Sequence, residues 1–178
     1  LLSGTSLVNT TDIILEKLTE LERLLDGIFL IKELSPKTTD KLLSFGELMS
    51  SLIIFEAMQE QGLNVQLKNS QNLIVTDSNF TNAAVQFDET NSNIKTYFEH
   101  NKKMVTILPG FISKSEDEEI TTLGRGGSDY TAAIMAAALK ADVLEIWTDV
   151  SGMFTNKIKN LFSLSDIHLF RPIVYLML

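Results

Sequence analysis

The stretch TTLGRGGSDYTAA, Thr121 to Ala133, joins a glycine-rich turn to the start of a helix. Ser128 is a favourable capping residue, and the alanine-rich sequence SDYTAAIMAAALK, residues 128–140, predicts a strong helix. The sequence DVLEIWT, residues 142–148, follows and predicts a buried strand with Trp147 in the core. Helices that alternate with short apolar strands indicate an α/β protein whose parallel sheet is covered on both faces.

The glycine-rich turn itself has the composition of an anion site. Gly124, Gly126 and Gly127 allow the backbone to approach a ligand, and the N–H groups that begin the helix point to the same place. Arg125 adds a fork of donors for a carboxylate or phosphate, and Asp129 can cap the helix, hold a cation or orient Arg125. A plain tight turn remains an alternative, because the spacing matches neither a P-loop nor a dinucleotide-binding fingerprint.

Working outward, apolar periodicity and glycine or proline breaks predict the other elements. We expect helices over 11–26, ending at Gly27, over 37–61, closed by Gly62, and around 94–99. We expect strands over 64–68 and 72–76, a buried strand in the apolar run 104–112 that ends at Pro109 and Gly110, and an acidic surface loop over 114–120.

Size and composition fit one soluble globular domain. The chain has 178 residues, 44% of them hydrophobic, a net charge of -8 and no cysteine. Thiolate metal sites, disulfides and cysteine nucleophiles are therefore excluded, and the acidic charge argues against nucleic acid or an anionic membrane as a partner. With no secretory signal and no apolar run judged long enough for a bilayer, we expect a cytoplasmic protein.

Four segments, in order, resemble aspartate kinases, which are members of the amino acid kinase family. The closest resemblance covers residues 121–155. The others are GTS, Gly4 to Ser6; LSPKTTDKLLSFGELMSS, residues 34–51, with the Gly46-Glu47 pair; and VTILPGFI, residues 105–112.

The resemblance implies a three-layer α/β sandwich with a mostly parallel central sheet, the carbamate kinase-like fold. It implies transfer of the γ-phosphoryl group of ATP to the side-chain carboxylate of L-aspartate, with Mg²⁺, on the path to lysine, threonine and methionine. We expect residues 1–178 to form a single, incomplete catalytic domain without the C-terminal regulatory domains, and to form a homodimer or larger homo-oligomer.

The resemblance also implies roles for individual residues. Arg125 should bind the α-carboxylate of aspartate, Glu47 its α-ammonium group, and Thr11 should also contact the substrate. Arg125 and Asp129 are the expected catalytic residues, and Ser128 should help place the reacting carboxylate. No protein metal ligand is expected, and the expected nucleotide contacts are Gly4, Thr5, Ser6, Gly126, Gly127, Thr148, Asp149 and Phe154.

The chain also departs from the family pattern. Leu1 stands where the family has a phosphate-neutralising lysine, and the segment that the family has between the Gly-Thr-Ser loop and the substrate threonine is missing. Three alternatives therefore stay open: a kinase for glutamate, acetylglutamate or a carbamate; a non-catalytic protein that binds aspartate or nucleotide; and the kinase part of a bifunctional aspartokinase/homoserine dehydrogenase.

Overall fold

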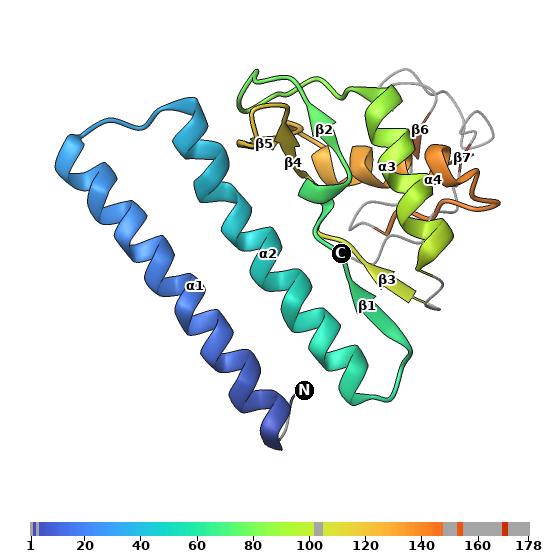
Figure 1. Cartoon of the computed structure of the whole chain (residues 1–178), viewed down its shortest axis with the longest axis horizontal. Coiled ribbons are helices and arrows are strands. Elements are labelled where there is room, and N and C mark those ends of the chain that lie inside the picture. Colours follow the sequence, from blue (N-terminus) through green and yellow to red (C-terminus); the bar gives the residue numbers. More distant parts are fainter. Residues whose placement is uncertain (1, 3, 102–104, 148–152, 155–168, 171–178) are drawn as a thin grey trace, which may run out of the picture.

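The computed structural model describes residues 2, 4–101, 105–147, 153–154 and 169–170. Short strands alternate with helices along the chain (Figure 1). In order, the elements are α1 (Gly4–Ile31), α2 (Pro36–Glu60), β1 (Val65–Leu67), the 3-10 turn η1 (Ser70–Asn72), β2 (Val75–Thr76), α3 (Phe87–His100), β3 (Val105–Ile107), β4 (Ile112–Ser115), β5 (Ile120–Thr122), α4 (Gly127–Leu139), β6 (Met153–Phe154) and β7 (Leu169–Phe170).

The strands form small sheets in which parallel pairing joins segments far apart in the sequence. β1 pairs with β3 in parallel, with Val65 opposite Val105. β2 pairs with β4 in parallel, while β4 and β5 form an antiparallel pair, and so do β6 and β7. The strands β1 to β5 lie between α2 on one side and α3 and α4 on the other (Figure 1). This confirms the predicted α/β class with helices on both faces.

The best-packed core lies between η1, β2, α3 and α4. Ile74 and Ile94 are completely buried there, and α4 adds Ile134, Met135 and Ala138. Leu123, directly before the glycine-rich turn, is part of the same cluster. The glycine-rich turn is therefore anchored at both ends, by Leu123 before it and by α4 after it, because both belong to the same core cluster.

Helix α2 begins and ends as the sequence predicts. The side chain of Ser35 accepts a hydrogen bond from the N–H of Thr38 at 3.1 Å, and Pro36 occupies the first turn. Gly62, at a φ of 80°, follows the last turn. By length and composition α2 could cross a membrane, contrary to the expectation from the sequence. Because it packs along β5 and β1, we interpret it as a helix of the domain itself.

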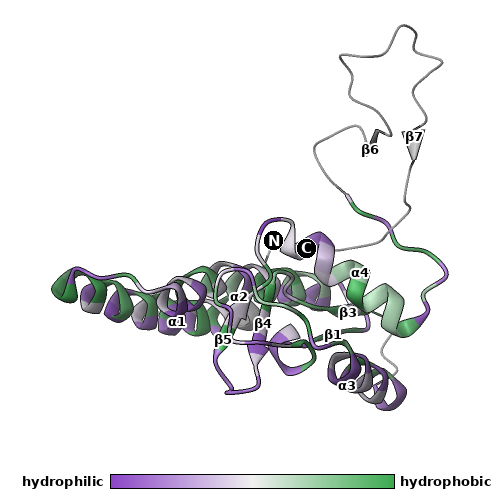
Figure 2. Cartoon of the chain, turned by 90° about the horizontal axis from the view of Figure 1, so that it is seen from above, coloured by the Kyte–Doolittle hydropathy of each residue, from purple (hydrophilic) through white to green (hydrophobic). Residues whose placement is uncertain are grey.

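Helix α1 is longer than predicted. It begins at Gly4 rather than near Thr11, and it continues through Gly27 to Ile31. A glycine weakens a helix by only about 1 kcal/mol, so neighbouring turns can carry the helix past it. α1 packs along α2, on the side away from the strands (Figure 1), and Figure 2 shows apolar residues along it. Phe29 and Leu30 are 67% and 78% exposed.

Two further expectations are wrong. Residues 142–147 do not form a strand, and Trp147 is 71% exposed rather than part of the core; residue 148 lies outside the described residues. The acidic segment 114–120 is not one surface loop, because its ends belong to the paired strands β4 and β5. The glutamates occupy the turn between them, so only the tip of this hairpin is a solvated acidic loop.

Candidate functional site

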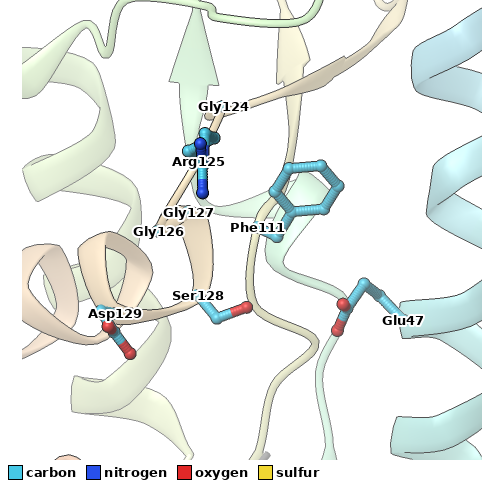
Figure 3. A pocket seen from close by; sticks show the side chains of 8 residues that line it. All are labelled: Glu47, Phe111, Gly124, Arg125, Gly126, Gly127, Ser128 and Asp129. Carbon is cyan, nitrogen blue, oxygen red and sulfur yellow. The ribbon is translucent and has the colours of Figure 1, made fainter.

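A cavity of about 320 Å³ lies where the loop between β5 and α4 faces α2 (Figure 3). Ligand pockets in proteins typically have volumes of about 300–1,000 Å³, so this one suits a small molecule. Its lining comes from three distant segments: Glu47, Phe111, Gly124, Arg125, Gly126, Gly127, Ser128 and Asp129. The structure thus brings the glycine-rich turn and the glutamate of α2 together, as expected from the sequence.

The glycines of the turn have conformations that other residues rarely adopt. Gly124 and Gly126 have φ angles of 75° and 72°, in the left-handed region. Gly126 precedes the first residue of α4 and, among the described residues, no side chain caps that helix end. The N–H of Gly127 donates to the carbonyl of Gly124 at 3.0 Å, and the positive end of the helix dipole lies at the cavity, which favours an anion there.

Phe111 forms one wall of the cavity in an unusual backbone conformation. Its φ is 68°, which is strained for a bulky side chain. Two hydrogen bonds hold it: its N–H donates to Oγ1 of Thr131 at 3.0 Å, and its carbonyl accepts from the N–H of Leu123 at 2.9 Å. Thr131 in turn donates to the carbonyl of Gly127 at 2.8 Å. The buried Thr131 therefore links the wall to the first turn of α4.

Close packing explains why glycines occupy positions 110 and 127. A Cβ atom on Gly127 would lie 2.6 Å from Cδ2 of Phe111. A Cβ atom on Gly110 would lie 3.0 Å from Cα of Ser128. The turn after β3 and the start of α4 therefore touch at two glycines, and the positions of Phe111 and Ser128 depend on each other.

Glu47 is a half-buried carboxylate that projects from α2 toward the cavity (Figure 3). Within the described part of the chain, its side chain has no hydrogen-bond or ion-pair partner. Loss of hydration in this partly buried place raises the pKa of Glu47 above the ordinary value. A cationic group of a ligand beside Glu47 would lower its pKa again, so this carboxylate is a candidate binding group for a cation.

Arg125 is exposed at the opposite wall, and it too has no ion-pair partner among the described residues. Figure 3 shows the hydroxyl of Ser128 and the carboxylate of Glu47 pointing toward each other. Asp129 lies beyond Ser128 from Glu47 in the same view, and no hydrogen bond joins its side chain to Arg125 within the described part of the chain. Opposite charges on one cavity, each without an ion-pair partner among the described residues, suit a ligand that carries both an ammonium group and a carboxylate.

Several residues expected at the site are not brought to this cavity. Thr11 is exposed on α1, which lies across α2 from the strands (Figure 1). Gly4, Thr5 and Ser6 form the first turn of α1 instead of a phosphate-binding loop. Phe154 lies in the short strand β6, and Thr148 and Asp149 lie outside the described residues.

The structure adds Phe111 to the residues expected from the sequence. Its signal was available, because it directly follows Pro109 and Gly110 at the end of an apolar strand, where a parallel sheet places binding residues. Among the described residues, no group of three histidine or acidic side chains could hold a metal ion by itself.

Comparisons with known proteins agree on one family. The sequence model of the amino acid kinase family matches residues 4–166. The bifunctional aspartokinase/homoserine dehydrogenase of Buchnera aphidicola is 35% identical over 145 residues, which are 81% of this chain and 18% of that protein. Lysine-sensitive aspartokinase 3 of Escherichia coli is 38% identical over 143 residues, which are 76% of this chain and 32% of that protein.

A solved structure shares the fold as well. Escherichia coli aspartokinase III in complex with aspartate and ADP matches with a TM-score of 0.66 and 37% sequence identity, over 77% of this chain and 32% of that chain. The present chain thus spans about a third or less of the length of these relatives, 18% of the first and 32% of the second.

Proposed function

Because this chain belongs to the amino acid kinase family, we propose that it supplies the amino-acid-binding part of an aspartate kinase. That enzyme transfers the γ-phosphoryl group of ATP to the side-chain carboxylate of L-aspartate. The observation that carries the proposal is that Glu47 and Arg125, of opposite charge, line one small cavity and have no ion-pair partner in the part of the chain that the structure describes. The aspartokinase names of the relatives, and the aspartate and ADP bound in one of them, support the choice of substrates.

In this proposal the chain fixes the two ends of the amino acid. Arg125 binds the α-carboxylate, and Glu47 binds the α-ammonium group by a charge-assisted hydrogen bond. The side-chain carboxylate is then left near Ser128 and the start of α4. One of its oxygens attacks the γ-phosphorus, the bond from that phosphorus to the bridging oxygen of ADP breaks, and 4-phospho-L-aspartate and ADP result.

Donor and acceptor are both anions, so catalysis consists mainly of alignment and of offsetting their repulsion. The helix dipole of α4 and the N–H groups of its first turn that follow Gly127 supply fixed positive potential without reorganisation. We assign the terminal phosphates of ATP to this end of the cavity.

We propose that Mg²⁺ arrives with ATP. Mg²⁺ prefers oxygen ligands, keeps several waters and is usually held by one or two carboxylates together with substrate phosphates. The lining fits this need, because Asp129 is an exposed carboxylate at the phosphate end of the cavity. Bound there, Mg²⁺ would offset charge between the phosphates and the incoming carboxylate.

The test combines turnover with binding. The complete protein is incubated with ATP, Mg²⁺ and an acceptor, and any acyl phosphate is trapped with hydroxylamine. We expect hydroxamate from L-aspartate and not from L-glutamate. Calorimetry should show binding of L-aspartate, and much weaker binding of succinate, which lacks the ammonium group that Glu47 would bind. Equal affinity for succinate would refute the assignment of Glu47, and absence of hydroxamate from a protein that binds L-aspartate would refute the kinase.

A further inference from the structure

Asp40 is a completely buried carboxylate on α2, and the proposed reaction does not use it. Its exposed fraction is 0%. Oδ2 accepts hydrogen bonds from the N–H of Thr81 at 2.8 Å and from the N–H of Thr122 at 3.1 Å, and Oδ1 accepts from Oγ1 of Thr122 at 2.7 Å. A buried carboxylate is tolerated only with such partners, so these three bonds define its place in the fold.

The partners of Asp40 are the two supports of the glycine-rich turn. Thr122 ends β5, two residues before Gly124 and three before Arg125. Thr81 and Asn82 lie against Gly124: a Cβ atom on that glycine would be 2.5 Å from Oδ1 of Asn82 and 3.4 Å from the carbonyl oxygen of Thr81. Asp40 therefore holds both the strand that leads into the turn and the segment on which the turn rests.

The same helix carries Glu47. Seven residues separate Asp40 from Glu47, which is close to two helical turns, so both side chains leave α2 on one face. Lys37 of α2 also pairs with Glu119, next to β5, at 2.7 Å, but that ion pair is solvent-exposed, whereas the bonds of Asp40 are buried. The distance between the ammonium-binding group and the carboxylate-binding group of the cavity thus depends on this junction.

We propose that Asp40 is a positioning residue, which fixes Glu47 relative to Arg125 by bonding α2 to Thr122 and Thr81 and thereby sets the affinity for the α-amino acid. The inference rests on the proposed function of the cavity. A residue with a purely structural role would change the amount of folded enzyme and hence the maximal rate. A positioning residue instead changes the KM for L-aspartate much more than the KM for ATP, because its partners Thr122 and Thr81 adjoin Gly124 and Arg125, whereas the phosphates are assigned to the start of α4 beyond them.

Two variants approach the junction from opposite sides. Asp40→Asn keeps the size of the side chain but replaces charge-assisted bonds by neutral ones. Thr122→Val removes only the hydroxyl that donates to Oδ1 of Asp40. This variant tests the junction if Asp40→Asn fails to fold. The matched control is Ser44→Ala, since Ser44 is buried on the same helix but its hydroxyl donates only to the carbonyl of Lys41, within α2.

In the complete protein, the hydroxamate assay gives KM for L-aspartate and for ATP. We expect Asp40→Asn to raise the KM for L-aspartate about five- to tenfold and Thr122→Val about threefold, with less than additive effects in the double variant, as contacting residues show. The KM for ATP should change by less than about twofold, and saturating L-aspartate should restore the rate.

The outcomes separate the two proposals. An active wild-type protein whose variants lose maximal rate at unchanged KM for L-aspartate overturns the positioning role and leaves the kinase in place. An equal rise of both KM values overturns it too. A wild-type protein without hydroxamate overturns the kinase. In that case the Kd for L-aspartate, measured by calorimetry, replaces KM, and Asp40→Asn must weaken it about five- to tenfold for the inference to stand.

Discussion

Glu47→Gln is the substitution that tests the cavity most directly. It keeps the shape of the side chain and removes the charge proposed to bind the ammonium group of L-aspartate. A hydrogen bond to a charged group contributes about 1.5–3 kcal/mol. At about 1.4 kcal/mol for each factor of ten, the Kd for L-aspartate should rise about 10- to 150-fold. The Kd for succinate, which has no ammonium group, should stay the same or fall.

The same substitution should not destabilise the protein without ligand. Partial burial raises the pKa of Glu47, so the folded state binds the proton more tightly than the unfolded chain does. Above the raised pKa this carboxylate therefore opposes folding, and the penalty fades as the pH falls through the raised pKa toward the ordinary value. The glutamine variant lacks the penalty, so its Tm at neutral pH should equal or exceed that of the wild type, and the difference should shrink in acid.

Thermal denaturation with and without L-aspartate, together with calorimetry from pH 7 downward, measures both effects. In the wild type, affinity should decline on acidification at a pH above the range of an ordinary glutamate, because only the ionised Glu47 binds the ammonium group. Glu16→Gln, on the exposed face of α1, is the matched control and should change neither quantity. A Glu47→Gln protein with wild-type affinity, or one with a clearly lower Tm without ligand, would contradict the reasoning.

Three further substitutions test packing, two of them around the cavity and one on α1. Gly127→Ala places a Cβ atom 2.6 Å from the ring of Phe111; it should cost about 1–3 kcal/mol of unfolding free energy in urea and weaken L-aspartate binding. Thr131→Val leaves the N–H of Phe111 without its acceptor and should cost about 1–3 kcal/mol, whereas Thr131→Ser should cost less. Gly27→Ala meets no atom within 4 Å on α1 and should stabilise the protein by about 0.5–1 kcal/mol; a lower Tm would mean that α1 does not continue through residue 27.

Local signals predicted most of the fold. The apolar spacing of residues 37–61 and the glycine at 62 located α2 to within a residue, and the alanine-rich stretch located α4 equally well. Gly27 misled, because a single glycine lowers helix propensity without stopping a helix that is supported by a neighbour. The prediction of a buried strand around Trp147 was wrong for a different reason. An apolar sequence pattern shows that a segment could be buried, but it forms a buried strand only where a neighbouring strand pairs with it.

The site was predicted where its residues share one segment or a specific pattern. The glycine-rich turn, Arg125 and Glu47 were expected together, and the structure places them on one cavity. The place of Phe111 after Pro109 and Gly110 could have marked it as a candidate, but its role as a wall arises from a left-handed backbone and from contact with Gly127, which only the tertiary fold shows. Asp40 was missed because a carboxylate on a helix is ordinarily solvated, and only the tertiary fold supplies its three donors.

Helix α2 also has a mechanical consequence. The junction at Asp40 acts as a fulcrum, and the rise of about 1.5 Å per residue makes the arm from there to Glu47 about 10 Å long. A tilt of about 10° around that fulcrum would carry the carboxylate roughly 2 Å, well beyond the tolerance of about 0.5 Å within which a binding group remains effective. Because α1 packs along α2, a force applied to α1 far from the cavity would tilt α2 and displace Glu47.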